Sequence, residues 1–341
     1  MPAYRPLVIA GQLRRQYLLP PDGPPMLDTP GGNLLYAAAG AHLWDESDEE
    51  TLGIMARIGE DYPQEWIRNF KKIGFDTQGI KILPESIDLR TFLVYTDIHT
   101  AQIANPVSHF ARLGLTFPKS LLGYQPPEEK QDSRARQNPD SPRLLDIPET
   151  YKQPRAVHLC PLDFATHMQF AAAFRQFGAT AITIDPGPGY MNGNFLLDLR
   201  SLLQGMTAFL PSEEEIRALF WGRTTDLWEM AAILGGFGCQ AIVIKRGGRG
   251  QYLYETETGR RWEIPAYPTN PFDLTGAGDA FCGGFLAGYA KTLDPLQACL
   301  HGNIAASLNI EGSGPFYAFD AMPGLAQARL LSLSEITKEI I

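Results

Sequence analysis

The residues best suited to chemistry lie near the end of the chain, in the run from Asp273 to Phe285. Glycine and alanine at 276–278 allow a tight turn that points successive amide N–H groups at one place, and the apolar helix expected after it adds the positive end of its dipole. Such a turn can bind an anion. Asp279, in the first turn of the helix, would lie beside that anion, where its carboxylate could accept a proton from an attacking hydroxyl. No Lys follows the glycines, so the run is not a Walker A loop.

This run resembles the C-terminal signature of the PfkB family of carbohydrate kinases, which have the ribokinase-like fold. The signature reads D-x-x-G-A-G-D followed by A-F-x-G-G-F, and this chain supplies it with Leu274 as the one unusual residue. The resemblance implies that Asp279 is the catalytic base. It also implies that three amides stabilise the transferred phosphoryl group, those of Gly276, Ala277 and Gly278. The alternative is a glycine-rich helix start that merely packs against a strand.

A second segment, 209–215, resembles the family's N-x-x-E segment, with Ser212 in the Asn position and Glu215 as the acid. The resemblance implies that Glu215 acts near Mg2+ and its waters, a role that suits a carboxylate because Mg2+ prefers oxygen ligands. The same two residues could also form a capping box at a helix N-terminus. The two roles are compatible.

The segment 242–250 resembles the strand and glycine turn that lie along the nucleotide in the family, with Gly247 and Gly250 at the family's glycines. Lys245, like the two arginines after it, could reach the phosphates or be a solvated cation of the turn. Asn303 matches a position near the adenine, although an Asn among alanines could equally pack or cap. ATP is therefore the expected nucleotide.

A monovalent cation, K+ in particular, is a further expectation from the resemblance. It would lie near Asp273 and Thr275, with the loop 312–314 on its other side.

The acceptor segment departs from the family's pattern. Gly31 and Gly32 begin a run that resembles G-G-x-x-x-N-x-A, but the Asn position holds Tyr36. The Asp that grips sugar hydroxyls in the family corresponds to Gln16. These changes remove a carboxylate and a carboxamide, two groups suited to a polyol.

Three arginines near this segment offer different recognition chemistry. Arg14, Arg15 and Arg90 could pair with a carboxylate or phosphate of the acceptor, because a guanidinium binds such anions through two nitrogens. Arg90 falls on an expected flap, where the family often carries a substrate contact. Each arginine could instead be an exposed surface charge. Together with Tyr36 they favour an aromatic or anionic acceptor.

Short apolar runs alternate with helical patterns along the chain, which is typical of βαβ units and a mostly parallel sheet. The expected strands are Leu7–Ala10, Leu52–Ile58, Ala156–Leu159, Ala181–Asp185, Thr207–Leu210 and Ala241–Lys245. The expected helices are Leu34–Leu43, Pro63–Ile73, Phe164–Phe177, Ser212–Phe220, Leu227–Leu234, Ala277–Ala290 and Leu296–Leu308. The pattern predicts a three-layer α/β/α domain, which the resemblance identifies as ribokinase-like.

Two stretches interrupt this alternation. Ile80–Thr96 alternates in the manner of a small sheet, so a β flap or lid is expected, with strands within about 11–30 and 80–100. Residues 118–154 are rich in proline and charge, which predicts a long exposed loop or a partly disordered insertion. The whole chain, 1–341, is expected to form one kinase domain with this insertion.

Composition narrows the function classes. The 341 residues carry 38 acidic and 29 basic side chains, a net charge of −9, and no dense Lys/Arg block, which argues against nucleic acid or an anionic membrane as a partner. No window approaches the apolar length of a membrane span. The 4 cysteines lack close pairing and are expected to be buried thiols in a reducing compartment, the cytoplasm.

The sequence therefore predicts an ATP- and Mg2+-dependent phosphotransferase that phosphorylates a hydroxyl of a small sugar-like or nucleoside-like acceptor. The alternative is a kinase-derived regulatory protein that binds the nucleotide but has an altered acceptor pocket. Relatives of the family often dimerise through the lid, so a homodimer of that kind is considered as well.

Overall fold

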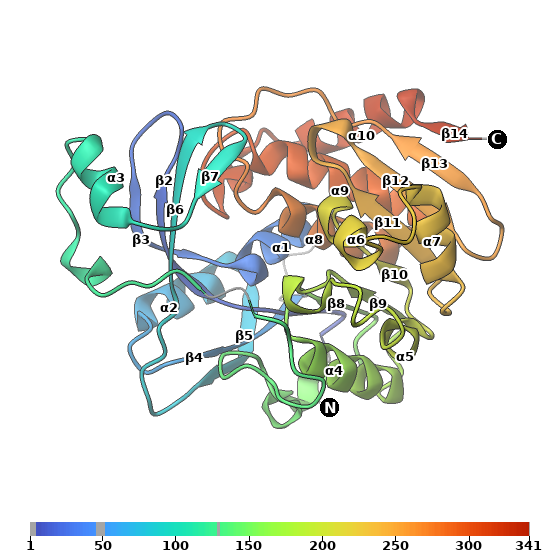
Figure 1. The fold of residues 1–341 in the computed structure, drawn as a ribbon, viewed down its shortest axis with the longest axis horizontal. Helices are drawn as coiled ribbons and strands as arrows, with labels where there is room; N and C mark the ends of the chain where they lie inside the picture. Colours follow the sequence, from blue (N-terminus) through green and yellow to red (C-terminus); the bar gives the residue numbers. More distant parts are fainter. Residues whose placement is uncertain (1–4, 46–51, 128–129, 341) are drawn as a thin grey trace.

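The computed structural model describes residues 5–45, 52–127 and 130–340. A ten-stranded sheet lies between two layers of helices, and a separate four-stranded sheet stands at one side of it (Figure 1). The predicted three-layer α/β fold with a mostly parallel central sheet and a small β lid is confirmed.

The strands of the large sheet, from one edge to the other, are β14 (Lys338–Ile340), β13 (Arg261–Ile264), β12 (Gln251–Glu255), β11 (Ala241–Lys245), β10 (Ala208–Phe209), β9 (Ala181–Ile184), β8 (Ala156–Leu159), β1 (Leu7–Ala10), β4 (Leu52–Ile58) and β5 (Phe75–Ile82). Those from β11 to β5 run parallel, whereas β12, β13 and β14 extend the sheet antiparallel. The carboxyl ends of the parallel strands therefore meet at one edge, where ligands bind in sheets of this type.

Each face of the sheet has its own hydrophobic core. In β1, Ile9 belongs to one core, and its neighbours Val8 and Ala10 belong to the other, as the alternation of a strand requires. The first core is covered by α1 (Asn33–His42), α2 (Gln64–Ile73), α8 (Ala277–Thr292), α9 (Pro295–Asn309) and α10 (Leu325–Ile336). The second is covered by α4 (Phe164–Gln176), α5 (Leu199–Leu203), α6 (Glu213–Leu219) and α7 (Leu227–Gly235).

Helix α8 is held closely by its neighbours on the first face. A Cβ on Gly283 would overlap the carbonyl of Ala37 in α1, and a Cβ on Gly284 would lie 2.7 Å from the Cβ of Ala305 in α9. The glycines of the A-F-x-G-G-F run thus let three helices approach at backbone distance. This packing fixes the axis of the helix whose first turn carries Asp279.

The four-stranded sheet is the lid, and its strands in spatial order are β3 (Met26–Gly31), β2 (Arg14–Leu19), β6 (Arg90–Asp97) and β7 (Thr100–Gln102). The flap predicted over Ile80–Thr96 begins too early. Ile80 and Ile82 belong to β5 and pair with β4 at the edge of the large sheet. Apolar residues alternate with the same period in a strand at the edge of the large sheet as in a lid strand, so the periodicity could not distinguish β5 from the lid.

One face of the lid is covered by the chain's own helix α3 (Pro106–Arg112) and the segment after it. The residues of this contact, the lid cluster, are Tyr17, Leu19, Phe92, Val94, Phe110, Leu121 and Tyr124. The covering residues begin in α3 and continue into the Pro-rich insertion, so that part of the insertion is attached to the lid.

The rest of the insertion is attached to the large sheet and its helices. Tyr151 is fully buried in the second core, and the buried Ser141 hydroxyl donates to Asp163 at 2.6 Å. The described part contains short 3-10 turns at Lys119–Leu121, Leu144–Asp146 and Glu149–Tyr151. Apart from these turns, the described part of the insertion forms no helix or strand, and it is not exposed at these anchors; residues 128–129 lie outside the described residues.

The four cysteines are buried free thiols, as the sequence predicts. No helix within the described residues is both long and apolar enough to cross a membrane.

Candidate active site

The turn predicted to bind an anion precedes α8. Gly276 has φ of 73°, and a Cβ there would overlap the ring of Tyr36, so both conformation and space require glycine. The amide of Ala277 donates to the carbonyl of Leu274 at 3.2 Å. Within the described residues, the amides of Gly276 and Gly278 make no hydrogen bond. Two of the three predicted donors are therefore available, whereas that of Ala277 is already engaged, which corrects the expectation for this amide.

Asp279 lies in the first turn of α8, largely buried but with part of the residue still exposed. Its carboxylate makes no hydrogen bond or ion pair with the described residues. Burial raises the pKa of Asp279 to about 7, with the carboxylates of Asp185 and Glu215 acting in the same direction and Lys245 opposing them. A carboxylate with that pKa can both accept and release a proton near neutral pH.

A buried ion pair lies beside this turn. The Lys245 Nζ is 2.6 Å from Asp185 Oδ2, and it lies 3.5 Å from the position that a Cβ on Gly278 would take. Burial raises the pKa of Asp185 to about 6, although Lys245 opposes the shift. Burial would lower the pKa of Lys245, but the carboxylate of Asp185 outweighs it and raises that pKa. The pair therefore brings a fixed cation to the turn.

Asp185 is a site residue that sequence reasoning missed. It stands in the run Asp-Pro-Gly-Pro-Gly, whose glycines suggest a dinucleotide loop that its prolines then oppose. The usable signal was its place directly after the buried strand β9, because the carboxyl ends of β9, β10 and β11 meet at one edge.

Ser212 and Glu215 form the capping box that the sequence suggested at the start of α6. The Ser212 amide and hydroxyl donate to Glu215 Oε2 at 2.7 and 2.8 Å, and the Glu215 amide donates back to the hydroxyl at 3.2 Å. Within the described residues, Oε1 of Glu215 makes no hydrogen bond. One carboxylate oxygen thus serves the helix and the other is unengaged by these residues, and the Glu215 carboxylate is near enough to Asp279 to raise the pKa of that carboxyl.

Asp273 is buried near the base of the turn. Its Oδ1 accepts from the Thr275 amide at 2.9 Å, whereas its buried Oδ2 has no partner among the described residues. The hydroxyl of Ser313, in the loop expected on the other side of a monovalent cation, is buried and unpartnered in the same part of the structure. A buried carboxylate oxygen without a hydrogen-bond donor fits a bound cation, because burial of an unpaired polar oxygen is costly.

The glycine turn after β11 forms a short 3-10 turn over Gly247–Arg249. Gly250 has φ of 83°, and a Cβ there would overlap the carbonyl of Ile264 on β13. Glycine is therefore required at 250 by packing, while Gly247, with φ of 55°, has open space around it.

The side chain of Asn303 is fully occupied by the protein. Its amide nitrogen donates to Gln251 Oε1 and to the Pro265 carbonyl, both at 2.8 Å, and its oxygen accepts from the Tyr267 amide at 2.9 Å. In the structure Asn303 thus holds the loop after β13, which is the packing alternative that the sequence left open.

The acceptor residues predicted from the sequence do come together. The Tyr36 hydroxyl donates to Gln16 Oε1 at 3.3 Å, and both side chains are buried. A Cβ on Gly31 would overlap the Gln16 carboxamide, and Gly32 has φ of 102°. Burial raises the pKa of Tyr36, so its hydroxyl keeps its proton. Gln16 and Tyr36 thus satisfy each other directly beside Gly276.

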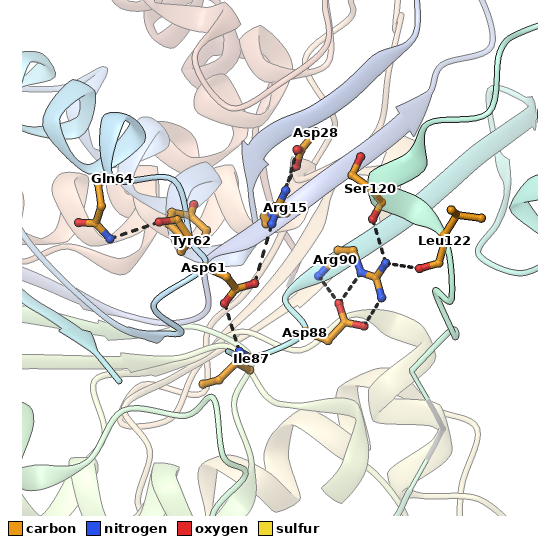
Figure 2. Close-up of polar contacts among 10 residues, drawn as sticks. All are labelled: Arg15, Asp28, Asp61, Tyr62, Gln64, Ile87, Asp88, Arg90, Ser120 and Leu122. Carbon is orange, nitrogen blue, oxygen red and sulfur yellow. Dashed lines mark hydrogen bonds and ion pairs between the residues drawn. The ribbon is translucent and has the colours of Figure 1, made fainter. Parts of the chain in front are cut away.

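Arg90 is engaged within the lid rather than beside Gly31 and Gly32. Its guanidinium donates to both oxygens of Asp88 at 2.7 Å and to the carbonyls of Ser120 and Leu122 at 2.9 Å (Figure 2). The guanidinium of Arg90 therefore fastens the insertion to the lid, and the expectation of an acceptor contact is not met by this arrangement.

The other two arginines are also paired. Arg15 binds Asp28 at 2.7 Å and lies 3.9 Å from Asp61, so it spans from the lid to the loop after β4 (Figure 2). Arg14 binds Asp140 of the insertion at 2.9 Å. The predicted preference for an anionic acceptor loses its basis, because each guanidinium already has a carboxylate partner.

Known proteins are similar to this chain in sequence and in fold. A model of the pfkB family carbohydrate kinases matches residues 152–321. A cytidine kinase of Thermococcus kodakarensis is 28% identical over 300 residues, which make up 86% of this chain and 91% of that protein.

Solved structures agree on the fold. A nucleoside kinase of Burkholderia thailandensis in complex with inosine superposes with a TM-score of 0.66 at 19% identity, covering 97% of this chain and 100% of the other. A fructokinase double mutant of Vibrio cholerae O395, with fructose, ADP and potassium ion bound, superposes with a TM-score of 0.66 at 15% identity, covering 97% and 99%. With its D-x-x-G-A-G-D turn and its lidded, mostly parallel sheet, this chain belongs to the PfkB family of carbohydrate kinases.

Proposed function

We propose that the chain is one kinase domain that transfers the γ-phosphoryl group of ATP to a hydroxyl of a small nucleoside-like or sugar-like acceptor. The observation that carries this proposal is the place of Asp279. A carboxylate with a pKa of about 7 stands in the same turn as two amides that make no hydrogen bond with the described residues, and the Lys245 ammonium is held next to Gly278.

In the proposed reaction Asp279 accepts the proton of the acceptor hydroxyl as its oxygen bonds to the γ-phosphorus. The bond between that phosphorus and the β–γ bridging oxygen breaks, and ADP leaves with the electron pair. The amides of Gly276 and Gly278 donate to the phosphoryl oxygens, on which negative charge is spread in the transition state.

Lys245 would act on the same phosphoryl group. Its ammonium already lies against Gly278, and Asp185 keeps it in place at 2.6 Å. A preorganised cation costs no reorganisation when charge develops during the reaction.

The remaining nucleotide residues are proposed from their places at the carboxyl edge. Ser212 begins the segment after β10, and the turn with Gly247 and Gly250 follows β11, so both border the same edge as Lys245. Asn303 would contribute indirectly, by holding the loop 265–267 beside the nucleotide.

The donor set also fits two cations. Oε1 of Glu215 would hold a water of Mg2+, which when bound to the phosphates offsets their charge. The unpartnered Oδ2 of Asp273 would face K+.

A nucleoside is the favoured acceptor class. Gln16, Gly31, Gly32 and Tyr36 lie together next to the catalytic turn, and they carry amide, aromatic and backbone groups with no charge. Arg90 and its neighbours are paired, so a neutral acceptor suits the site better than an anionic one. The relatives named as a cytidine kinase and as a nucleoside kinase solved with inosine support this choice.

The test is a panel of nucleosides, sugars and sugar acids, each incubated with Mg-ATP, with ADP followed by a coupled assay and products by mass spectrometry. We expect at least one neutral nucleoside to yield ADP and its monophosphate in equal amounts. ATP binding without phosphorylation of any acceptor would instead favour the nucleotide-binding regulatory protein.

A further inference from the structure

We propose that Tyr95, on lid strand β6, is a positioning residue that makes the geometry of the catalytic turn depend on the lid. The proposal rests on the proposed kinase function. Its basis is a direct contact, since the hydroxyls of Tyr95 and Thr275 share a hydrogen bond of 3.0 Å. Thr275 immediately precedes Gly276, so the lid touches the turn next to one of its two free amides.

Thr275 is well placed to transmit this contact. Its amide donates to Asp273 Oδ1 at 2.9 Å, and its carbonyl accepts from Asn309 Nδ2 of α9, also at 2.9 Å. Among the described residues, the Thr275 hydroxyl has Tyr95 as its one hydrogen-bond partner. Thr275 is thus held by the lid, by the preceding Asp273 and by helix α9.

The lid reaches Gly276 from a second direction as well. On β6, Phe92 and Val94 belong to the lid cluster, and Tyr95 points to the opposite face. On β2, Gln16 accepts from the hydroxyl of Tyr36, whose ring packs against Gly276. The turn therefore lies between two tyrosines, each hydrogen-bonded to a residue on the other side of the lid interface.

The hairpin between β2 and β3 lies against two further loops, the one that precedes the turn and the one that follows α9. A Cβ on Gly23 would lie 2.8 Å from Cζ of Phe272, and a Cβ on Gly314 would lie 2.8 Å from Cε of Met26. These contacts are apolar and hold the lid near both loops. Tyr95 differs from them because its hydrogen bond has a specific direction and ends beside Gly276.

This arrangement has a chemical consequence. Donors that stabilise a phosphoryl group must be held within a few tenths of an ångström, and a displacement of about 1 Å can cost a hundredfold in rate. With the lid away, Thr275 loses its side-chain partner and the turn is less restrained. Phosphoryl transfer would then be fast only when the lid is closed over an acceptor, which limits hydrolysis of ATP by water.

The test compares Tyr95→Phe with Tyr17→Phe. Both residues are lid tyrosines, but the buried hydroxyl of Tyr17 has no partner among the described residues, so the control removes the same atom without a contact. We expect Tyr95→Phe to lower kcat about tenfold or more with little change in KM for ATP, and to raise the ratio of ATP hydrolysis to acceptor phosphorylation. Tyr17→Phe should leave all three near wild type.

A partner variant shows whether Tyr95 acts through Thr275. Thr275→Val should lower kcat as Tyr95→Phe does, the double variant should be no worse than Thr275→Val, and Thr275→Ser, which keeps the hydroxyl, should restore most of the rate. Additive losses in the double variant would overturn the proposal.

A second readout needs no kinase activity. Hydrogen exchange of the Ala277 amide, which is hydrogen-bonded to the Leu274 carbonyl within the turn, should be faster in Tyr95→Phe than in Tyr17→Phe when measured by NMR on the protein alone. Equal exchange in the two variants would overturn the positioning role, even if the acceptor panel succeeded. Faster exchange together with an acceptor panel that yields no product would contradict the proposed function while leaving the contact between lid and turn supported.

Discussion

The ammonium of Lys245 lies 2.6 Å from the carboxylate of Asp185, and the pair stands against Gly278 at the start of α8. These two residues come from the ends of β11 and β9, 60 positions apart in the chain. Their contact gives the anion-binding turn a cation that cannot move far, in addition to its backbone donors.

Lys245→Met should therefore damage both stability and rate. Removing the cation leaves the buried Asp185 unpaired, a change that costs about 3–5 kcal/mol in comparable buried pairs. Adding Asp185→Asn should recover much of the free energy of unfolding but none of kcat. Urea unfolding and steady-state kinetics measure the two effects.

The matched control for this cation is Arg249→Met, because Arg249 lies on the turn after β11 with its side chain 64% exposed. Its loss should change the free energy of unfolding by about 1 kcal/mol or less. Equal losses of kcat in the Lys245 and Arg249 variants would contradict the special place of Lys245.

The pH dependence of the rate should report Asp279. A general base must be ionised to act, and burial raises the pKa of Asp279 to about 7. We expect kcat/KM to rise about tenfold per pH unit up to pH 7 and to level off above it. A direct product assay between pH 5 and 9 measures this; a rate that is constant down to pH 5 would argue against Asp279 as the base.

The ionised carboxylate of Asp279 should lower the stability of the folded protein at high pH. Because the pKa of Asp279 is higher in the folded than in the unfolded chain, protonation of this carboxyl favours the folded state. That contribution to the free energy of unfolding is fully present below the unfolded pKa near 3.8 and is lost as pH rises through about 7. Asp279→Asn should thus raise Tm by about 2 °C or more at pH 8, and the gain should vanish near pH 4. Thermal unfolding of both proteins at pH 8 and pH 4 measures this. An equal difference in Tm between variant and wild type at both pH values would show that the charge of the carboxylate is not the cause.

The lid cluster bears on oligomeric state. Since α3 and the insertion cover the outer face of the lid, with Phe110 and Leu121 both 1% exposed, the strands of that face cannot pack directly against a second lid. We predict a monomer of 37.7 kDa by light scattering, in place of the lid-mediated homodimer that the sequence left open. A dimer that dissociates on Val107→Glu, at the exposed side of α3, would overturn this.

The structural features that could be predicted from the sequence are those determined by residues close together in the chain. The D-x-x-G-A-G-D turn before α8 needs positive φ at Gly276, and the box of Ser212 with Glu215 needs only residues three apart. The helices and parallel strands likewise have their periodicity within a single segment. Each could be inferred without knowing what packs against it.

The parts missed depend on partners distant in the chain. Asp185 became a site residue only through Lys245, and Arg90 lost its expected role because its guanidinium binds the carbonyls of Ser120 and Leu122. The buried anchors of the insertion were hidden for the same reason, since Tyr151 has no local pattern that marks it as core. Composition describes the average polarity of a segment, whereas a few single apolar residues determine where the segment packs against the rest of the protein.

The most direct test of Asp279 as the catalytic base compares wild type and Asp279→Asn on the best acceptor, with ATP affinity measured on the same samples by calorimetry. We expect kcat to fall by at least about a hundredfold, since general-base catalysis contributes about 10² to 10⁴, while Kd for Mg-ATP changes by less than about threefold. A variant that keeps most of its activity while binding ATP normally would contradict Asp279 as the catalytic base.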